Sequence, residues 1–396
     1  TLNIDAVPEG TPTFPQAPLL RVSGPLLECQ IVETPLLNML NFQTLIATKA
    51  ARVCSATLGE PVMEFGLRRA QGIDGGLAAS RAAYIGGCAG TSNVLAGRLF
   101  DIPVLGTHAH SWVMCFGDEL EAFRAYASAM PNNCVFLVDT YDTLQGVDNA
   151  ATVGRELEAR GHELVGVRLD SGDLAYLSIE ARKRLDAAGF GDARIVASND
   201  LDEHVIRSLK AQGATIDTWG VGTKLITAYD QPALGGVYKL AAIQNDAGEW
   251  EHRIKLSEQA IKVSTPGLLQ IRRFQEGGEF RGDVIWDELL GVTTPPTMVD
   301  PMDGTRRRTM TEGPGEDLLV PVFRRGQRCY EAPPLTTIRA TVEANLAALH
   351  GGIKRFMNPH QYPVGLEQRL YERKRELIIE ARERLQDTAS QGASDA

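Results

Sequence analysis

The sequence predicts an α/β protein built on a parallel sheet. Between residues 61 and 221, short apolar runs alternate with segments of helical periodicity, at roughly 25–30 residues per repeat, the spacing that parallel strands with helical crossovers need. Each apolar run ends in a charged, histidine-containing or glycine-rich turn. Ligands of α/β proteins bind at the carboxyl ends of strands. We therefore expect a ligand site there, in either an irregular barrel or a doubly wound sheet.

The elements of this sheet are expected in strict alternation. The strands are 61–65, 102–106, 134–139, 163–169, 193–198 and 215–221, and the helices between them are 76–85, 118–129, 148–160, 175–188 and 201–212. An apolar run at 26–32 predicts a preceding strand. A helix that ends near Val53 follows this strand. Thr34-Pro35 predicts its start, because threonine can serve as the N-cap and proline suits the first helical turn.

After about residue 232 the pattern changes to that of antiparallel strands. Segments 236–243, 250–255, 260–264 and 268–274 alternate, with Gly and Asp turns between them, and 335–349 and 364–386 read as helices. Five parts are therefore expected. These are a leading segment with one strand of a second α+β domain (1–35), the parallel sheet (36–232), antiparallel strands of the second domain (233–334), C-terminal helices (335–386) and a disordered tail (387–396).

Composition excludes several classes of protein. A net charge of −10 argues against a general nucleic-acid binder and against binding to an anionic membrane. The six cysteines are scattered without a C-x-x-C pair, which fits reduced thiols in the cytoplasm and neither a disulfide framework nor a zinc site. Because the overall field is negative, an anionic substrate must be drawn in by local arginines.

The segment G-V-R-L-D-S-G-D-L (166–174) carries the strongest signal for a site. A hydrophobic run stops at Arg168, Asp170 and Asp173 around a Ser-Gly turn. Charges at the end of a buried strand are costly unless they are paired or meet a ligand. The arginine suits a carboxylate or phosphate, and the aspartates suit hydroxyls or a divalent metal. An internal ion pair that caps the next helix is the alternative.

Other strand ends carry similar groups. Arg68 and Arg69 follow the first strand, a turn with His108 and His110 follows the second, and G-V-G-T (220–223) follows the last. The glycines suit a phosphate or a plain tight turn. One histidine is expected to face the site as a nucleophile or base, or else to be bonded to backbone. Phe65 either stacks on a flat ring or packs in the core.

Seven spaced motifs together resemble the nicotinate phosphoribosyltransferase family. They are E-F-G-L-R-R-A-Q-G-x-D-G-G (64–76), T-S-N-V-L-A-G (91–97), G-T-H-A-H-S (106–111), R-L-D-S-G-D-L (168–174), G-V-G-T (220–223), L-G-G-V-Y-K-L (234–240) and N-P-H-x-Y-P-V (358–364). The resemblance implies an irregular α/β barrel with an open α+β sandwich, in a homodimer. It also implies joining of nicotinate to 5-phosphoribosyl 1-diphosphate with coupled ATP hydrolysis and Mg²⁺. An N-terminal part of the family is expected to be missing here.

The resemblance assigns roles to individual residues. His110 is the expected phosphohistidine, and Arg168 the clamp for the nicotinate carboxylate. Phe65, Thr107 and Ser92 would also contact nicotinate, and Asp170 would lie near the ribose. The remaining expected contacts are Arg68 on the diphosphate, Asn199, Gly222 and Thr223 on the 5′-phosphate, and Asp173 on a metal, unless it is a helix cap.

Two other functions stay open from the sequence. One is a transferase for nicotinamide or quinolinate; the neutral Ser92 favours nicotinate, because the related nicotinamide enzyme has an aspartate there that would repel a carboxylate. The other is a truncated, catalytically silent protein that binds phosphoribosyl ligands.

Overall fold

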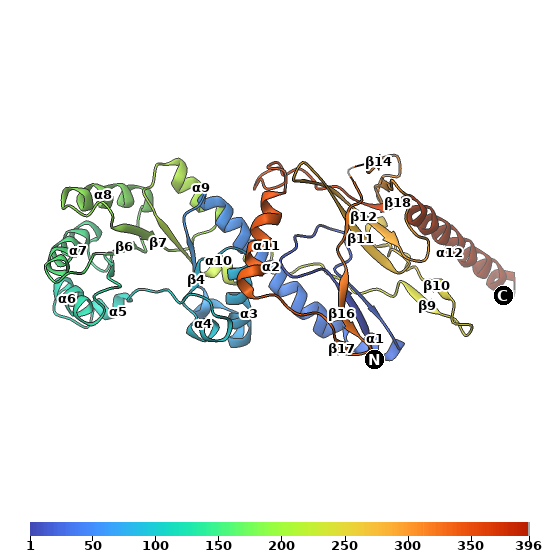
Figure 1. Cartoon of the computed structure of the whole chain (residues 1–396), viewed down its shortest axis with the longest axis horizontal. Helices are drawn as coiled ribbons and strands as arrows, with labels where there is room; N and C mark the ends of the chain where they lie inside the picture. The colour runs from blue at the N-terminus through green and yellow to red at the C-terminus, as the bar shows by residue number, and fades with distance from the viewer. Residues whose placement is uncertain (312, 395–396) are drawn as a thin grey trace. The chain divides into compact units, whose positions relative to one another are not determined.

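The chain folds into two compact units, which are described here separately (Figure 1). The computed structural model describes residues 1–311 and 313–394. Unit 1 comprises residues 1–38 and 236–396, and unit 2 comprises residues 39–235. The sequence placed borders after residues 35 and 232. The segments expected as 233–334 and 335–386 both fall in unit 1.

Unit 2 is built on one parallel six-stranded sheet, in the order β4-β3-β8-β7-β6-β5. The strands are β3 (Val62–Glu64), β4 (Gly90–Thr91), β5 (Val135–Leu137), β6 (Gly166–Leu169), β7 (Arg194–Ala197) and β8 (Thr218–Val221). Strands β5 and β8 are buried along their whole length. Burial on both faces is why these strands read as continuous apolar runs.

Helices connect the strands of unit 2. They are α2 (Glu33–Thr57, which begins in unit 1), η1 (Leu67–Arg69), α3 (Gly72–Ile85), α4 (Val94–Phe100), α5 (His110–Val113), α6 (Glu119–Ala129), α7 (Thr143–Glu158), α8 (Leu174–Ala187), α9 (Glu203–Ala211) and α10 (Thr223–Ile226). Helices α6, α7 and α8 pack side by side, and α7 and α8 cover β6 (Figure 1). Asp118, Asp142, Asp173 and Asp202 each accept a backbone N–H as the N-cap of the following helix.

The expected strands 26–32 and 102–106 were wrong. The run 26–32 is not a strand but contains helix α1 (Leu26–Ile31), which begins after Pro25; leucine, glutamate and glutamine favour a helix there. The run 102–106 forms only a single bridge, from Val104 to Thr91, because Pro103 has no N–H for a ladder. The two-residue strand β4 was not expected, since it is too short to show a period.

Unit 1 contains two larger sheets and a hairpin. The four-stranded sheet has the order β17-β16-β1-β2, the six-stranded sheet has the order β14-β13-β18-β12-β11-β15, and β9 pairs with β10. The strands are β1 (Asn3–Ala6), β2 (Leu20–Ser23), β9 (Ala242–Gln244), β10 (Trp250–His252), β11 (Leu269–Glu276), β12 (Glu279–Asp287), β13 (Thr297–Val299), β14 (Arg307–Thr309), β15 (Glu316–Asp317), β16 (Val320–Arg324), β17 (Gln327–Arg328) and β18 (Val364–Glu367). The helices are α1, η2 (Ala260–Lys262), α11 (Leu335–Ala347) and α12 (Gln368–Ser394).

Several boundaries in unit 1 differ from expectation. The expected strand 260–264 is absent, since Ala260–Lys262 form the turn η2, and the expected helix 364–386 begins only at Gln368. The preceding Val364–Glu367 is strand β18, which lies between β12 and β13 in the sheet. Leu366 and Leu370 still share one core cluster, so their spacing of four misleadingly resembled a helical face. The tail expected to be disordered is helical through Ser394, and 395–396 lie outside the described residues.

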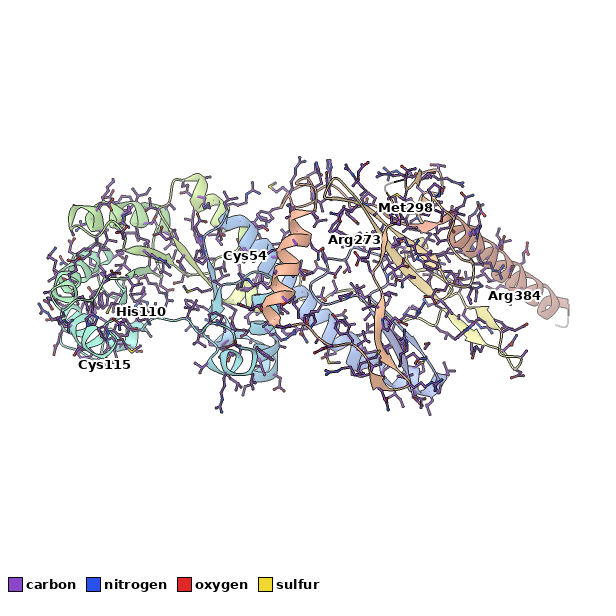
Figure 2. All side chains as sticks on the ribbon, in the orientation of Figure 1. Cys54, His110, Cys115, Arg273, Met298 and Arg384 are labelled. Carbon is purple, nitrogen blue, oxygen red and sulfur yellow. The ribbon has the colours of Figure 1, made fainter. Side chains whose placement is uncertain are left out.

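A buried ion pair joins the neighbouring strands β11 and β12 in the six-stranded sheet of unit 1. Arg273 on β11 donates from Nε and Nη2 to both oxygens of Asp283 on β12, each at 2.8 Å. Tyr362 donates to the same carboxylate, and Phe14 stacks on the Tyr362 ring at 3.9 Å. Figure 2 labels Arg273 in this part of the chain. The network therefore ties the N-P-H-x-Y-P-V motif and the leading segment to the sheet.

Within the described residues, every helix is too short or too polar to cross a bilayer.

The buried pair predicts a strong effect on stability. Asp283→Ala should lower the free energy of unfolding by about 3–5 kcal/mol, because it leaves the Arg273 charge buried without its partner. The neighbouring Arg272–Asp317 pair is bidentate as well but far more exposed. Asp317→Ala should therefore cost only about 1 kcal/mol. Urea unfolding of both variants measures the difference, and equal losses would contradict this account.

Candidate active site

A cavity of about 280 Å³ lies at the carboxyl ends of the parallel strands of unit 2. Its wall brings together seven of the residues expected in the site, from segments far apart in the sequence. They are Phe65, Arg68, Ser92, Thr107, His110, Arg168 and Asp170; Gly106, His108, Ala109 and Leu137 complete the wall. The convergence follows from the parallel sheet, because all its carboxyl ends meet at one edge.

Arg168, in β6, is fixed by three hydrogen bonds. Its Nε donates to Ser198 Oγ at 2.9 Å, its Nη1 to Thr107 Oγ1 at 2.9 Å, and its Nη2 to Asp170 Oδ1 at 2.9 Å. A guanidinium carries five N–H groups, so one N–H on each terminal nitrogen is not used by these bonds. The protein thus fixes the orientation of the side chain, and the remaining N–H groups of Nη1 and Nη2 can still donate to a ligand.

Asp170 is held as an anion beside this arginine. Burial raises the pKa of its carboxyl, but the hydrogen bond from Ser198 and the charge of Arg168 outweigh burial and lower it below the usual value. Oδ1 accepts from both Arg168 and Ser198. Oδ2 lies 3.7 Å from His110 Nε2, so the second oxygen of Asp170 faces the cavity histidine.

His110 begins helix α5 and is half-exposed (Figure 2). Its Nδ1 lies 3.1 Å from Thr140 Oγ1, a hydrogen-bond distance. Its Nε2 lies 3.9 Å from Asp139 Oδ1 and 3.7 Å from Asp170 Oδ2, too far for hydrogen bonds. One ring nitrogen is therefore anchored, and the other is open to a reaction partner between two carboxylates.

Asp139 is a site residue that the sequence reasoning did not select. Its Oδ2 accepts from the Asp170 N–H at 3.0 Å and from Ser171 Oγ at 2.6 Å. Its Oδ1 is buried without a partner in the structure and faces His110. The available signal was its position directly after an apolar strand, the same position that marked Asp170.

His108, two residues before His110, has a different role. It is buried, and its Nε2 accepts the backbone N–H of Leu137 on the edge strand β5 at 3.2 Å. The ring lies among Phe123, Tyr126 and Phe136. Burial lowers the pKa of His108 to about 4. This histidine is therefore a neutral structural group that anchors the 106–110 turn, the alternative that the sequence left open.

Phe65 lies against a glycine. A Cβ on Gly220 of β8 would approach the Phe65 ring to 2.8 Å, so only glycine leaves room for the ring there. The Arg168 guanidinium carbon lies 5.6 Å from the ring centroid, within range of a cation–π contact. Phe65 therefore both packs on β8 and presents itself to the cavity.

Four expected site residues do not line this cavity. Asn199 follows β7, and Gly222 and Thr223 follow β8, so all three lie at the same sheet edge as the cavity. Asn199 adopts a left-handed backbone with φ of 97°. Asp173 caps α8 by accepting the Tyr176 N–H at 3.1 Å, which is the helix-cap alternative for this residue. Within the described residues, no cluster of three or more His, Cys, Asp or Glu could hold a metal by itself.

The fold and the cavity define a class. Arginines, carboxylates and an open histidine that gather around one cavity at the strand ends of a parallel sheet are typical of α/β enzymes that bind small molecules. Comparison with known sequences identifies the family. Residues 61–259 match the nicotinate phosphoribosyltransferase (NAPRTase) family, and residues 270–374 match its C-terminal domain. The chain belongs to the nicotinate phosphoribosyltransferases, a family of NAD-biosynthesis enzymes.

Individual relatives support this membership. The chain is 48% identical to nicotinate phosphoribosyltransferase of Bacillus subtilis over 384 residues, which cover 96% of this chain and 78% of the relative. It is 35% identical to the Homo sapiens enzyme of that name, covering 93% and 78%. The crystal structure of human nicotinic acid phosphoribosyltransferase superposes with a TM-score of 0.82 at 32% identity, covering 95% and 82%. The crystal structure of nicotinate-nucleotide pyrophosphorylase from Pyrococcus furiosus superposes with a TM-score of 0.69 at 26% sequence identity. The match covers 88% of this chain and 81% of that one.

The state of His108 predicts a dependence of stability on pH. Its pKa is about 4 in the folded chain and near 6.5 when unfolded. Between these two pH values the unfolded chain therefore binds more protons than the folded chain. The contribution of neutral His108 to the free energy of unfolding is complete above pH 6.5 and is lost as the pH falls to 4. The loss amounts to about 3 kcal/mol. His108→Leu should remove this component from urea unfolding curves measured between pH 7 and 4. An unchanged pH dependence would contradict the assignment.

Proposed function

We propose that this chain joins nicotinate to 5-phosphoribosyl 1-diphosphate, giving nicotinate mononucleotide and diphosphate with coupled ATP hydrolysis. The observation that carries the proposal is Arg168, which is oriented by three protein acceptors and has N–H groups left for a ligand. Such a fork matches a carboxylate in two hydrogen bonds. Membership in the family supports the choice of reaction.

Nicotinate is assigned to the part of the cavity that Phe65 and Arg168 both line. The phenyl ring offers a stacking face for the pyridine ring. The neutral Ser92, also on the cavity wall, accepts a carboxylate substrate without repulsion. Thr107 orients Arg168 through its hydroxyl. Nucleophilic attack comes from the pyridine nitrogen, so no residue needs to remove a proton.

The phosphoribosyl group is assigned to the adjacent strand ends. The anionic Asp170 would stabilise positive charge that develops on the ribose as diphosphate departs. Arg68 would hold the leaving diphosphate. The 5′-phosphate is assigned to Gly222, Thr223 and Asn199; the ion pair of Lys224 with Asp202, at 2.6 Å, ties these two loops together.

Mg²⁺ is assigned to Asp139 and Asp170 rather than to Asp173. The unpartnered buried Oδ1 of Asp139 and the Oδ2 of Asp170 both face His110, which leaves two hard oxygen ligands on one side. Mg²⁺ is commonly held by one or two carboxylates together with substrate phosphates. When bound, it would neutralise charge on the leaving diphosphate.

ATP coupling is assigned to His110. Its Nε2 would attack the γ-phosphorus of ATP, forming an N–P bond while the P–O bond to ADP breaks. The attacking form of the ring would carry its proton on Nδ1, toward Thr140 Oγ1, so that Nε2 keeps the lone pair that forms the bond to phosphorus. Phosphorylation would then change the charge beside Arg168 and Asp170, and so bias the affinity for substrates over products.

The finer architecture belongs to the same proposal. The Thr91–Val104 bridge and the His108–Leu137 bond extend from the two edges of the parallel sheet, in support of an irregular barrel. The two sheets of unit 1 would form the open sandwich. A cytoplasmic homodimer is the expected form of the protein.

The reaction is tested by measuring nicotinate mononucleotide formation with and without ATP. We expect turnover with nicotinate, little with nicotinamide or quinolinate, and stimulation by ATP. His110→Ala should retain basal turnover and lose the stimulation by ATP. Preferred use of nicotinamide or quinolinate would overturn the substrate assignment. Absence of product would favour a silent phosphoribosyl-binding protein. Stimulation of the His110→Ala variant by ATP would refute the assignment of His110 as the phosphohistidine.

Replacing the fork tests the carboxylate clamp. Arg168→Lys should raise KM for nicotinate by about 10- to 100-fold, because a lysine cannot make the paired hydrogen bonds and leaves protein acceptors unpaired. Arg124→Lys is a matched control, since Arg124 makes a bidentate pair with Glu156 outside the cavity. Steady-state kinetics on both variants decide the point. A KM unchanged in the Arg168 variant would refute the clamp.

A further inference from the structure

Glu64 is the last residue of β3 and lies directly behind the cavity wall. Its side chain is completely buried. It does not line the cavity, whereas its neighbour Phe65 does. A buried carboxyl group is stable only when its oxygens receive hydrogen bonds or a counter-charge. The donors around Glu64 therefore show what it holds in place.

One oxygen of Glu64 holds the turn that carries the aromatic and the arginine of the site. Oε1 accepts the backbone N–H of Gly66. Gly66 precedes the short helix η1, which contains Arg68, and its carbonyl accepts the Arg69 N–H at 2.8 Å. A Cβ on Gly66 would come within 2.4 Å of the Ile226 side chain, so this turn is packed against α10. Oε1 therefore fixes the backbone between Phe65 and Arg68.

The other oxygen holds the opposite wall. Oε2 accepts from Thr91 Oγ1 at 2.6 Å and from Ser80 Oγ at 2.9 Å. Thr91 Oγ1 in turn accepts the N–H of Asn93 at 3.0 Å, and the Glu64 carbonyl accepts the Ser92 N–H at 3.0 Å. Ser92 lies between these anchored residues and lines the cavity. The Glu64 carboxylate, together with this backbone bond, therefore sets the position of Ser92 relative to Phe65 and Arg68.

We propose that Glu64 is a positioning residue that sets the separation between the Phe65–Arg68 turn and Ser92, and thereby the fit of the pyridine ring and the diphosphate. This inference rests on the proposed function for the identity of the ligands. The carboxylate acts through other groups and does not touch substrate. A Gln side chain has the same shape, but its Nε2 is a donor where Thr91 and Ser80 already donate. Glu64→Gln therefore forces one side of the network to rearrange.

Misplacement of substrate-binding groups by about 1 Å costs up to about 100-fold in catalysis. We expect Glu64→Gln to raise KM for both nicotinate and 5-phosphoribosyl 1-diphosphate by about tenfold. We also expect its affinity for inorganic diphosphate, measured by calorimetry on the full chain, to fall by a similar factor. Binding of diphosphate does not require turnover. The calorimetric test thus remains decisive if the wild-type chain forms no nicotinate mononucleotide, a result that would defeat only the proposed function.

Glu367 provides a matched control in unit 1. It is also a completely buried glutamate, it also accepts the N–H of the residue two positions later, at 2.7 Å, and it also accepts a threonine hydroxyl, from Thr293 at 2.9 Å. We expect Glu367→Gln to lower Tm by about as much as Glu64→Gln does. Unlike Glu64→Gln, it should leave KM and diphosphate affinity unchanged. A purely structural role for Glu64 would make the two variants behave alike, which would overturn the proposal.

Thr91→Val provides a second test if the Glu64 variant does not fold. It removes one of the donors to Oε2 and the acceptor of the Asn93 N–H, and it keeps the shape of the side chain. It should weaken diphosphate affinity about threefold, since the carboxylate keeps two of its three donors. The positioning role would be refuted if the folded Glu64→Gln variant kept the diphosphate affinity and KM of the wild type. If only Thr91→Val folds, the same result in that variant would refute it.

Discussion

The site depends on how the charge of Arg168 is satisfied at the end of a buried strand. The guanidinium lies at the carboxyl end of β6, where burial makes an unpaired cation costly. It bonds to Ser198 after β7, to Thr107 in the 106–110 turn, and to Asp170. One side chain thus joins three segments of unit 2. The same bonds leave part of its fork unused, so the interaction that stabilises the site also makes it ready for an anion.

Side chains of the same chemical type have different roles in this site because they differ in burial. His108 and His110 lie in one turn, yet the aromatic cluster around His108 lowers its pKa to about 4 and keeps it neutral, while His110 is half-exposed beside two carboxylates. Among the carboxylates, Asp170 is held as an anion that faces the cavity, whereas Glu64 is buried behind it and connects backbone segments. Environment, more than residue type, decides which group is available for chemistry.

The strands and helices of unit 2 were largely predictable, because most of its apolar runs are largely buried strands and four of the five expected helices begin at an aspartate cap. The failures have local causes. Leu26–Ile31 form a helix in spite of their apolar run, and Pro103 reduces 102–106 to one bridge. Residues 364–367 form a strand, although the spacing of Leu366 and Leu370 resembles a helical repeat. In the last case only the pairing with β12 and β13 distinguishes strand from helix.

The sequence by itself determined the parallel α/β class and the reactive strand ends, since these follow from local periodicity and from charges at the ends of apolar runs. Motif spacing then indicated the family. Tertiary structure decided which groups meet. It made Asp173 a helix cap, brought Asp139 to His110, and used Gly220 to make room for Phe65. These outcomes depend on distances between segments far apart in the chain, and only the packing of the sheet and its helices fixes those distances.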